Sequence, residues 1–162
     1  STCIEFGANI GLNLRAINTL FPNVELEAVE INENAVKELR NFVPQKNIFH
    51  ESIIDFKPIK RRDLVLLKGV LIHVAPSDLD QVYQNIYDSS SNYVLICEYY
   101  NRTPVSLTYR GFEEMLFKRD FCGEFLEKFP DYRLVDYGFV YHGDPNCSQD
   151  DITWFLIQKV NK

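Results

Sequence analysis

The sequence lacks the patterns that define several classes of protein. No apolar run approaches the ~18 residues that a membrane span needs, and the first residues do not have the form of a signal peptide. The four cysteines form no CxxC pair and no short cluster with histidine, so we expect reduced thiols and no metal site. Basic residues number 17 against 23 acidic ones, and the net charge of −6 disfavours nucleic acid and anionic membranes as partners. These absences favour a cytoplasmic protein that acts on small molecules.

What is present is a regular alternation of apolar runs and helix-period segments along 162 residues. Hydrophobic residues make up 46% of the chain and charged residues 25%, which is typical of one globular domain. The expected strands are 3–6, 24–29, 47–49, 63–67 and 93–97. The expected helices are 10–20, one that follows Asn32 as its N-cap, one that Ser77 and Asp80 open as a capping box, and 111–129.

The pattern changes at the end of the chain. Segments 133–141 and 152–158 are strand-like, and the polar loop between them leaves no room for a helix, so they should pair as an antiparallel hairpin. The strand–helix alternation before them implies parallel strands with helices on both faces. We therefore predict an α/β fold with a doubly wound, Rossmann-like, mostly parallel sheet and a C-terminal antiparallel β-hairpin. We expect residues 1–162 to form a single domain, with the first strand directly at its start.

A candidate ligand site follows the first strand. That strand ends in Glu5-Phe-Gly-Ala-Asn-Ile-Gly11 and leads directly into a helix, where open α/β sheets bind their ligands. Gly7 and Gly11 let the backbone pass close to a ligand, and the helix start supplies free N–H groups. Glu30 closes the second strand, where a carboxylate can bind both hydroxyls of a ribose. The pattern predicts a nucleoside cofactor.

Two kinds of nucleoside cofactor fit this outline, and the spacing separates them. A dinucleotide fingerprint reads G-x-G-x-x-G, and the later glycine is missing after Gly11. Glu5 also disfavours a site that must hold a pyrophosphate, whereas its carboxylate suits a cofactor with a cationic amino-acid end. An NAD-dependent oxidoreductase is therefore the weaker alternative.

Glu5-x-Gly7-x-Asn9-x-Gly11 resembles the first motif of class I S-adenosylmethionine-dependent methyltransferases, with Asn9 in place of the middle glycine. The resemblance implies S-adenosyl-L-methionine as cofactor, with its methionine end on the glycine loop and its ribose on Glu30. The third-strand segment would contact adenine through Ser52 and Ile53, and Lys68-Gly69 occupies the fourth-strand motif. The cofactor residues that it implies are Glu5, Gly7, Ala8, Asn9, Gly11, Glu30, Ile31, Ser52, Ile53, Lys68 and Gly69.

A narrower resemblance concerns the acceptor. Lys68-Gly-Val-Leu-Ile-His73, Glu98-Tyr-Tyr-Asn101 and Gln149-Asp-Asp-Ile-Thr-Trp154 are among the segments similar to methylases associated with pseudaminic acid biosynthesis. This resemblance implies a small anionic acceptor, a nonulosonic-acid-type sugar or its precursor. Members of that group carry an N-terminal helical segment before the first motif, and the expectation here is a domain without it.

Candidate acceptor residues follow the fourth, fifth and sixth strands. The imidazole of His73 could act as a general base, although a packing histidine fits its apolar run equally well. Arginines and aromatic rings suit anionic sugars, and the plainer interpretation is a solvated loop. The candidate substrate residues are Tyr99, Tyr100, Asn101, Arg110, Arg119 and His142.

The sequence therefore predicts an enzyme that moves a methyl group from S-adenosylmethionine to a small anionic acceptor. A module that binds the cofactor without turnover is the second interpretation, and the oxidoreductase is the third. The oligomeric state stays open.

Overall fold

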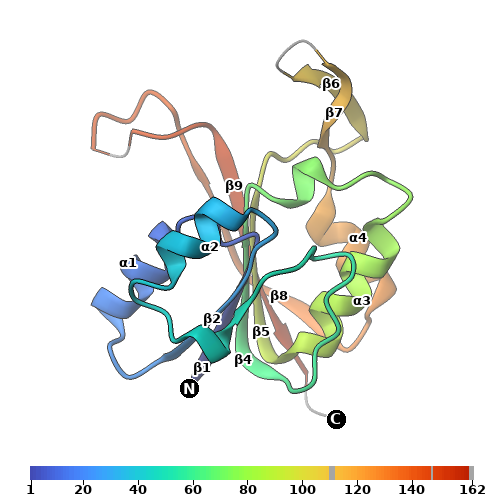
Figure 1. Cartoon of the computed structure of the whole chain (residues 1–162). Coiled ribbons are helices and arrows are strands. Elements are labelled where there is room, and N and C mark those ends of the chain that lie inside the picture. The colour runs from blue at the N-terminus through green and yellow to red at the C-terminus, as the bar shows by residue number, and fades with distance from the viewer. Residues whose placement is uncertain (110–111, 147, 161–162) are drawn as a thin grey trace.

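The computed structural model describes residues 1–109, 112–146 and 148–160. A seven-stranded sheet runs through the centre of the molecule (Figure 1). Its strands are β1 (Thr2–Phe6), β2 (Glu25–Val29), β3 (Ile48–Phe49), β4 (Arg62–Lys68), β5 (Ser90–Glu98), β8 (Tyr132–Val140) and β9 (Ile152–Lys159). The helices are α1 (Leu12–Leu20), α2 (Glu33–Leu39), α3 (Leu79–Ser89) and α4 (Phe121–Lys128), with two short 3-10 helices, η1 (Gln45–Asn47) and η2 (Leu71–His73).

The strand order is β3-β2-β1-β4-β5-β9-β8, and β9 runs antiparallel to both of its neighbours, β5 and β8. The remaining neighbours from β3 to β5 pair in parallel. The order reverses between β1 and β4, and ligands bind at the carboxyl ends of strands at such a switch point. The expected doubly wound sheet with a terminal antiparallel hairpin is confirmed.

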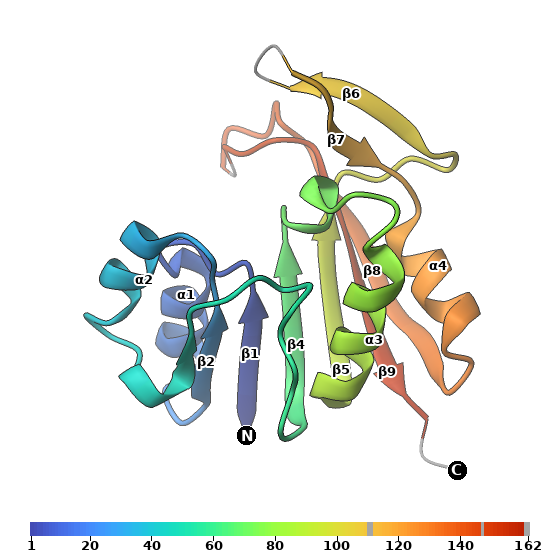
Figure 2. The same ribbon diagram turned by 45° about the vertical axis from the view of Figure 1, so that its right-hand side comes forward.

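Helices cover the two faces of the sheet (Figures 1 and 2). One apolar cluster joins β1, β2 and β4 to α1 and α2, with Leu14 and Leu39 fully buried against Ala28. The other cluster lies toward α3 and α4 and includes Val82 and Phe125. Because both faces of the central strands are buried, these strands appear in the sequence as continuous apolar runs.

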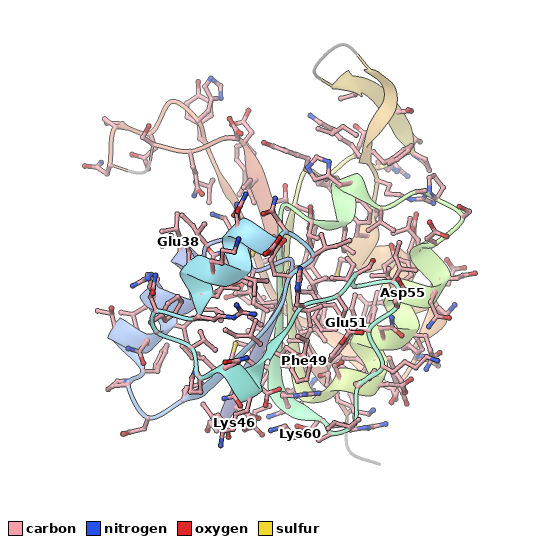
Figure 3. The ribbon with its side chains drawn as sticks, viewed as in Figure 1. Glu38, Lys46, Phe49, Glu51, Asp55 and Lys60 are labelled. Atoms are coloured by element: carbon pink, nitrogen blue, oxygen red, sulfur yellow. The ribbon has the colours of Figure 1, made fainter. Side chains whose placement is uncertain are left out.

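An ion pair is buried near the amino ends of the central strands. Arg62 donates to Glu27 Oε2 from Nε at 3.0 Å and from Nη2 at 2.6 Å, and both side chains are almost fully buried. Lys60 lies 2.6 Å from the other Glu27 oxygen, and Figure 3 labels it near the lower end of the sheet. These charges stabilise the end of the sheet opposite the ligand-binding edge, so their role is structural.

The expected N-cap at Asn32 is confirmed. Its side chain accepts hydrogen bonds from the amides of Asn34 and Ala35 at 2.9 and 3.2 Å. The expected capping box at Ser77 and Asp80 is wrong. Asp78 is the N-cap of α3 and makes no side-chain capping bond; its backbone is near the helical region (φ −102°, ψ −10°), whereas a capping side chain needs an extended backbone.

The expected helix over 111–129 is also wrong in its first half. Strands β6 (Val105–Tyr109) and β7 (Phe112–Lys118) form a separate antiparallel hairpin, and the helix begins only at Phe121. Asp120 starts it by accepting a hydrogen bond from the Gly123 amide at 2.8 Å. The hairpin stands beyond the carboxyl ends of β4 and β5 (Figure 2), and β7 contacts η2. Pairing with β6 overrides the helical pattern of this segment.

Candidate functional site

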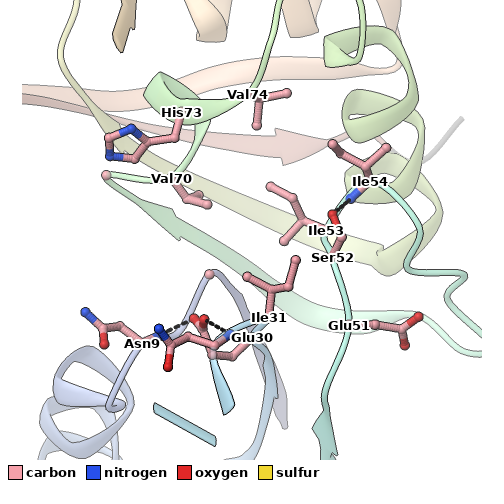
Figure 4. A pocket seen from close by; sticks show the side chains of 13 residues that line it. Asn9, Glu30, Ile31, Glu51, Ser52, Ile53, Ile54, Val70, His73 and Val74 are labelled. Carbon is pink, nitrogen blue, oxygen red and sulfur yellow. Dashed lines mark hydrogen bonds between the residues drawn. The ribbon is translucent and has the colours of Figure 1, made fainter. Parts of the chain in front are cut away.

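A cavity of about 430 Å³ opens at the carboxyl ends of β1, β2 and β4 (Figure 4). It lies over the strand-order reversal, where the fold predicts a ligand. Its lining residues are Gly7, Asn9, Glu30, Ile31, Asn32, Glu51, Ser52, Ile53, Ile54, Gly69, Val70, His73 and Val74. We call it the first cavity.

The glycine loop has a left-handed backbone at Gly7, Asn9 and Gly11, with φ of 70°, 50° and 79°. A Cβ atom at Gly7 would lie 2.5 Å from Cγ2 of Val70, and one at Gly11 would lie 2.4 Å from a ring carbon of Phe42. Glycine is therefore required at both positions by the conformation and by protein packing, before any ligand is considered.

Glu30 holds the loop in place. Its Oε2 accepts a hydrogen bond from the Asn9 amide and its Oε1 one from the Asn32 amide, both at 2.7 Å (Figure 4). The side chain is buried yet lines the first cavity. Each carboxylate oxygen can accept a further hydrogen bond, so the group can still receive a pair of hydroxyls.

Glu5 lies beneath the loop with half of its carboxylate unused. Its Oε1 accepts a hydrogen bond from Asn13 Nδ2 at 2.6 Å, while Oε2 has no partner within the described part of the chain. Burial raises the pKa of Glu5 to about 7, against the opposing effects of Asn13 and Lys68. An unpartnered buried oxygen is costly, and a cationic group above the loop would relieve that cost.

The far side of the first cavity is more apolar. Ile53 is almost fully buried, whereas Ile31 is 67% exposed, and both line the cavity. The hydroxyl of Ser52 accepts a hydrogen bond from the Ile54 amide at 3.2 Å. This bond leaves the Ser52 hydroxyl hydrogen available to a ligand.

The remaining predicted cofactor residues belong to the loop or lie next to it. Ala8 is buried, Gly11 is the N-cap of α1, and Lys68 closes β4 and lowers the pKa of Glu5. Gly69 lines the cavity with φ of 65°, and a Cβ there would meet nothing within 4 Å. Space next to Gly69 is therefore open.

A second cavity of about 230 Å³ adjoins the first. The two cavities share Gly69 and His73. The second cavity is lined by Gly69, Ile72, His73, Glu98, Tyr99, Leu116, Asp150 and Ile152. Two adjoining chambers suit a cofactor and a second reactant.

Of the candidate acceptor residues, His73 and Tyr99 line this second cavity. His73 is exposed on η2, which favours the functional interpretation over that of a packing histidine. The Tyr99 hydroxyl donates to Asp150 Oδ2 at 2.5 Å, and Lys118 Nζ lies 4.9 Å from the centre of the Tyr99 ring.

Glu98 is a site residue that the sequence reasoning missed. It closes β5 and is 2% exposed, and its Oε1 accepts hydrogen bonds from the Val70 and Leu71 amides at 2.9 Å each. Its Oε2 has no partner among the residues that the structure describes. Burial raises the pKa of Glu98 to about 7, opposed by nearby backbone amides. A charged residue at the end of an apolar strand was the available signal.

The predicted substrate residues Tyr100, Asn101 and Arg119 are not among the residues that line the first or the second cavity. Tyr100 packs against Phe155, with ring centres 5.9 Å apart, and Asn101 donates to the Thr103 carbonyl. Arg119 pairs with Glu124 at 2.7 Å and lines a separate cavity between α3 and α4.

The last two candidates lie farther along the chain. His142 Nδ1 lies 2.9 Å from Asp151 in the β8–β9 loop. Arg110 lies outside the described residues.

The described ranges contain no metal-binding cluster and no membrane-spanning helix. Across residues 1–109, 112–146 and 148–160, no group of three or more His, Cys, Asp or Glu side chains is arranged to hold a metal ion. None of the helices in the same ranges is long and apolar enough to cross a membrane. Cys3, Cys97 and Cys122 are free thiols, and Cys147 lies outside the described residues.

The strand order, the single antiparallel strand and the cavity at the β1–β4 reversal define the fold of class I S-adenosylmethionine-dependent methyltransferases. Sequence comparison finds no matching family model and no matching curated protein.

Solved structures of methyltransferases are similar to this chain in fold. The chain is similar to an O-methyltransferase of a trans-AT polyketide synthase of Brevibacillus brevis in complex with S-adenosyl-L-homocysteine. Identity is 15%, the TM-score is 0.76, and the match covers 99% of this chain and 67% of the other. It is also similar to 1,6-didemethyltoxoflavin-N1-methyltransferase of Burkholderia thailandensis, with 15% identity, TM-score 0.77 and coverage of 99% and 71%. The N-methyltransferase NodS of Bradyrhizobium japonicum gives 14%, 0.73, 99% and 79%.

Proposed function

We propose that this chain binds S-adenosylmethionine in the first cavity and transfers its methyl group to a small-molecule acceptor in the second. The observation that carries the proposal is the pair of adjoining cavities at the strand-order reversal, joined at Gly69 and His73. The first cavity carries the carboxylate of Glu30, with that of Glu5 beneath its loop, and these suit a ribose and an ammonium group.

Each end of the cofactor has a suitable group. The unpartnered oxygen of Glu5 would balance the cationic amino-acid end, and Glu30 would accept from the ribose hydroxyls. Ile31 and Ile53 offer apolar surface to a flat base, and Ser52 offers a hydroxyl. NAD fits less well because Glu5 would face a pyrophosphate, so the oxidoreductase remains the weaker alternative.

When bound, S-adenosylmethionine supplies an electrophilic methyl group. The residues of the chain would orient a nucleophile and exclude water from the junction of the cavities, and much of the rate enhancement can come from positioning. His73 lines both cavities, and its imidazole could take a proton from an acceptor hydroxyl or amine.

The narrower proposal is that the acceptor is a nonulosonic-acid-type sugar. The segments similar to pseudaminic-acid-associated methylases support it, and so does Lys118 beside the ring of Tyr99, where a carboxylate could lie. Glu98 and Asp150 line the second cavity itself, so the carboxylate of such a sugar would have to remain at the rim near Lys118.

Calorimetric titration with S-adenosylhomocysteine and with NAD tests the cofactor. We expect binding of the first only, and we expect Glu30→Ala to weaken it at least tenfold. Binding of NAD alone would refute the proposal. Incubation with radiolabelled S-adenosylmethionine and N-acetylneuraminic acid then tests the acceptor class. Cofactor binding without methyl transfer to any sugar would favour a module without turnover.

A further inference from the structure

The two carboxylate oxygens of Glu98 have different surroundings. Oε1 accepts hydrogen bonds from the Val70 and Leu71 amides and so holds the turn that leads into η2. Oε2 is buried and has no partner in the described ranges, while the side chain lines the second cavity. A buried charged oxygen without a partner is strongly unfavourable. The fold therefore keeps one unpaired acceptor oxygen on a side chain that lines this cavity.

The charges around the second cavity restrict what can enter it. Two of its described lining residues are acidic, Glu98 and Asp150, and none is Lys or Arg. Lys118 lies over the ring of the lining residue Tyr99, with Nζ 4.9 Å from the ring centre. Above pH 7, where Glu98 is ionised, a carboxylate or phosphate in this cavity would face like charges, whereas an N–H or O–H group would find an acceptor.

The size of the cavity argues against a water molecule as the natural occupant. Its volume of about 230 Å³ is several times the ~30 Å³ share of one water molecule, so a ring or a branched fragment can enter. Leu116 and Ile152 supply apolar wall opposite the polar groups. The cavity thus combines a body of apolar contact with one buried oxygen that can fix orientation.

We infer that Glu98 selects the methyl acceptor, because its Oε2 accepts a hydrogen bond from a hydroxyl or amine that enters the second cavity. This inference rests on the proposed function and narrows it: the end of the acceptor that is inserted is a hydrogen-bond donor and carries no carboxylate. Glu98 is thereby a specificity-determining residue.

The test uses three probes that share one ring. Cyclohexylamine, cyclohexanol and cyclohexanecarboxylate are titrated by NMR at pH 8, where Glu98 is ionised, into the protein saturated with S-adenosylhomocysteine. We expect the amine and the alcohol to bind at least tenfold more tightly than the carboxylate, and their relative affinities tell whether an amine or a hydroxyl is preferred. A carboxylate that binds as tightly as both others, or no binding of any probe, would overturn the inference.

Glu98→Gln is the matched variant. Glutamine keeps one oxygen for the Val70 and Leu71 amides and places an N–H donor where Oε2 was. We expect it to abolish the preference for the amine and alcohol while the affinity for S-adenosylhomocysteine stays within twofold. Glu127→Gln removes the same charge at the separate cavity between α3 and α4, and it should keep the preference. A Glu98→Gln protein that retains the preference contradicts the inference.

The probes in the unsubstituted protein test the inference even if Glu98→Gln does not fold. Failure of the proposed function is recognised separately, since it is the absence of S-adenosylhomocysteine binding. In that event the same probes are titrated into the free protein, where the preference still tests the oxygen of Glu98.

Discussion

Replacing Glu5 with glutamine should make the protein more stable and its cofactor site weaker. Glu5 is buried, and only one of its two carboxylate oxygens has a partner in the described structure. Glutamine has nearly the same shape and can still accept the hydrogen bond from Asn13 through its carbonyl oxygen. The substitution therefore removes the charge and leaves the packing in place.

The expected magnitude follows from the pKa. Burial raises the pKa of Glu5 from 4.5 to about 7, which corresponds to about 3 kcal/mol of destabilisation once the group is ionised in both states. The folded state holds the proton more tightly than the unfolded state, so this stability is fully present below pH 4.5 and is lost as pH rises through about 7. The buried amide of glutamine costs about 1 kcal/mol, which leaves a gain of about 2 kcal/mol at pH 8.

Binding should change in the opposite direction. A hydrogen bond between an ammonium group and a carboxylate contributes about 2 kcal/mol, so Glu5→Gln should weaken S-adenosylhomocysteine binding about 30-fold at pH 8. Urea unfolding at pH 4.5 and pH 8, with calorimetry at pH 8, measures both effects. Glu98→Gln is the control. Burial also raises the pKa of Glu98 to about 7, but its side chain lines the second cavity, so this substitution should leave the affinity for S-adenosylhomocysteine within twofold. A Glu5→Gln protein that is less stable at pH 8 and binds the ligand normally would refute the reasoning.

Three further substitutions test contacts that stabilise the fold around the site and at the opposite end of the sheet. Asn32→Ala should cost about 1 kcal/mol in urea unfolding through loss of the α2 cap, and Asn32→Asp should restore most of it. Arg62→Met should cost about 3 kcal/mol in urea unfolding, because buried Glu27 would lose both hydrogen bonds to Oε2 and keep only Lys60 at Oε1; an unchanged free energy of unfolding would contradict this role. Gly7→Ala should lower the free energy of unfolding by at least about 2 kcal/mol, since its Cβ would lie 2.5 Å from Val70 at a positive φ; an unchanged urea midpoint would contradict this close approach.

Most of the sheet could be predicted from the sequence, and so could the part of the candidate site formed by the glycine loop and Glu30. Continuous apolar runs alternating with helical periods indicate parallel strands, and the glycine loop with Glu30 lies at the carboxyl edge as expected. Both the strand–helix alternation and the glycine loop are patterns of residues close together in the chain, and a single sequence contains them. The hairpin over 105–118 was missed because its pairing is made between segments, and its apolar residues also fit a helix.

The second cavity was harder to foresee for the same reason. Glu98, Leu116 and Asp150 are far apart in the chain and meet only because β5, β7 and the loop before β9 converge. Arg119 shows the opposite case, since a charge that looked available is paired with Glu124. Which charges a fold leaves unpaired is decided by tertiary contacts, and spacing along the chain does not record it.

The separate hairpin has a consequence for how such a protein can diversify. It belongs to another sheet, meets the body of the domain at η2, and supplies Leu116 to the second cavity while contributing nothing described to the first. Mutations in its strands can therefore reshape one wall of the second cavity while the described lining of the first cavity stays unchanged. Under the proposed function, changes in this short segment would alter the fit of the acceptor and spare the cofactor site.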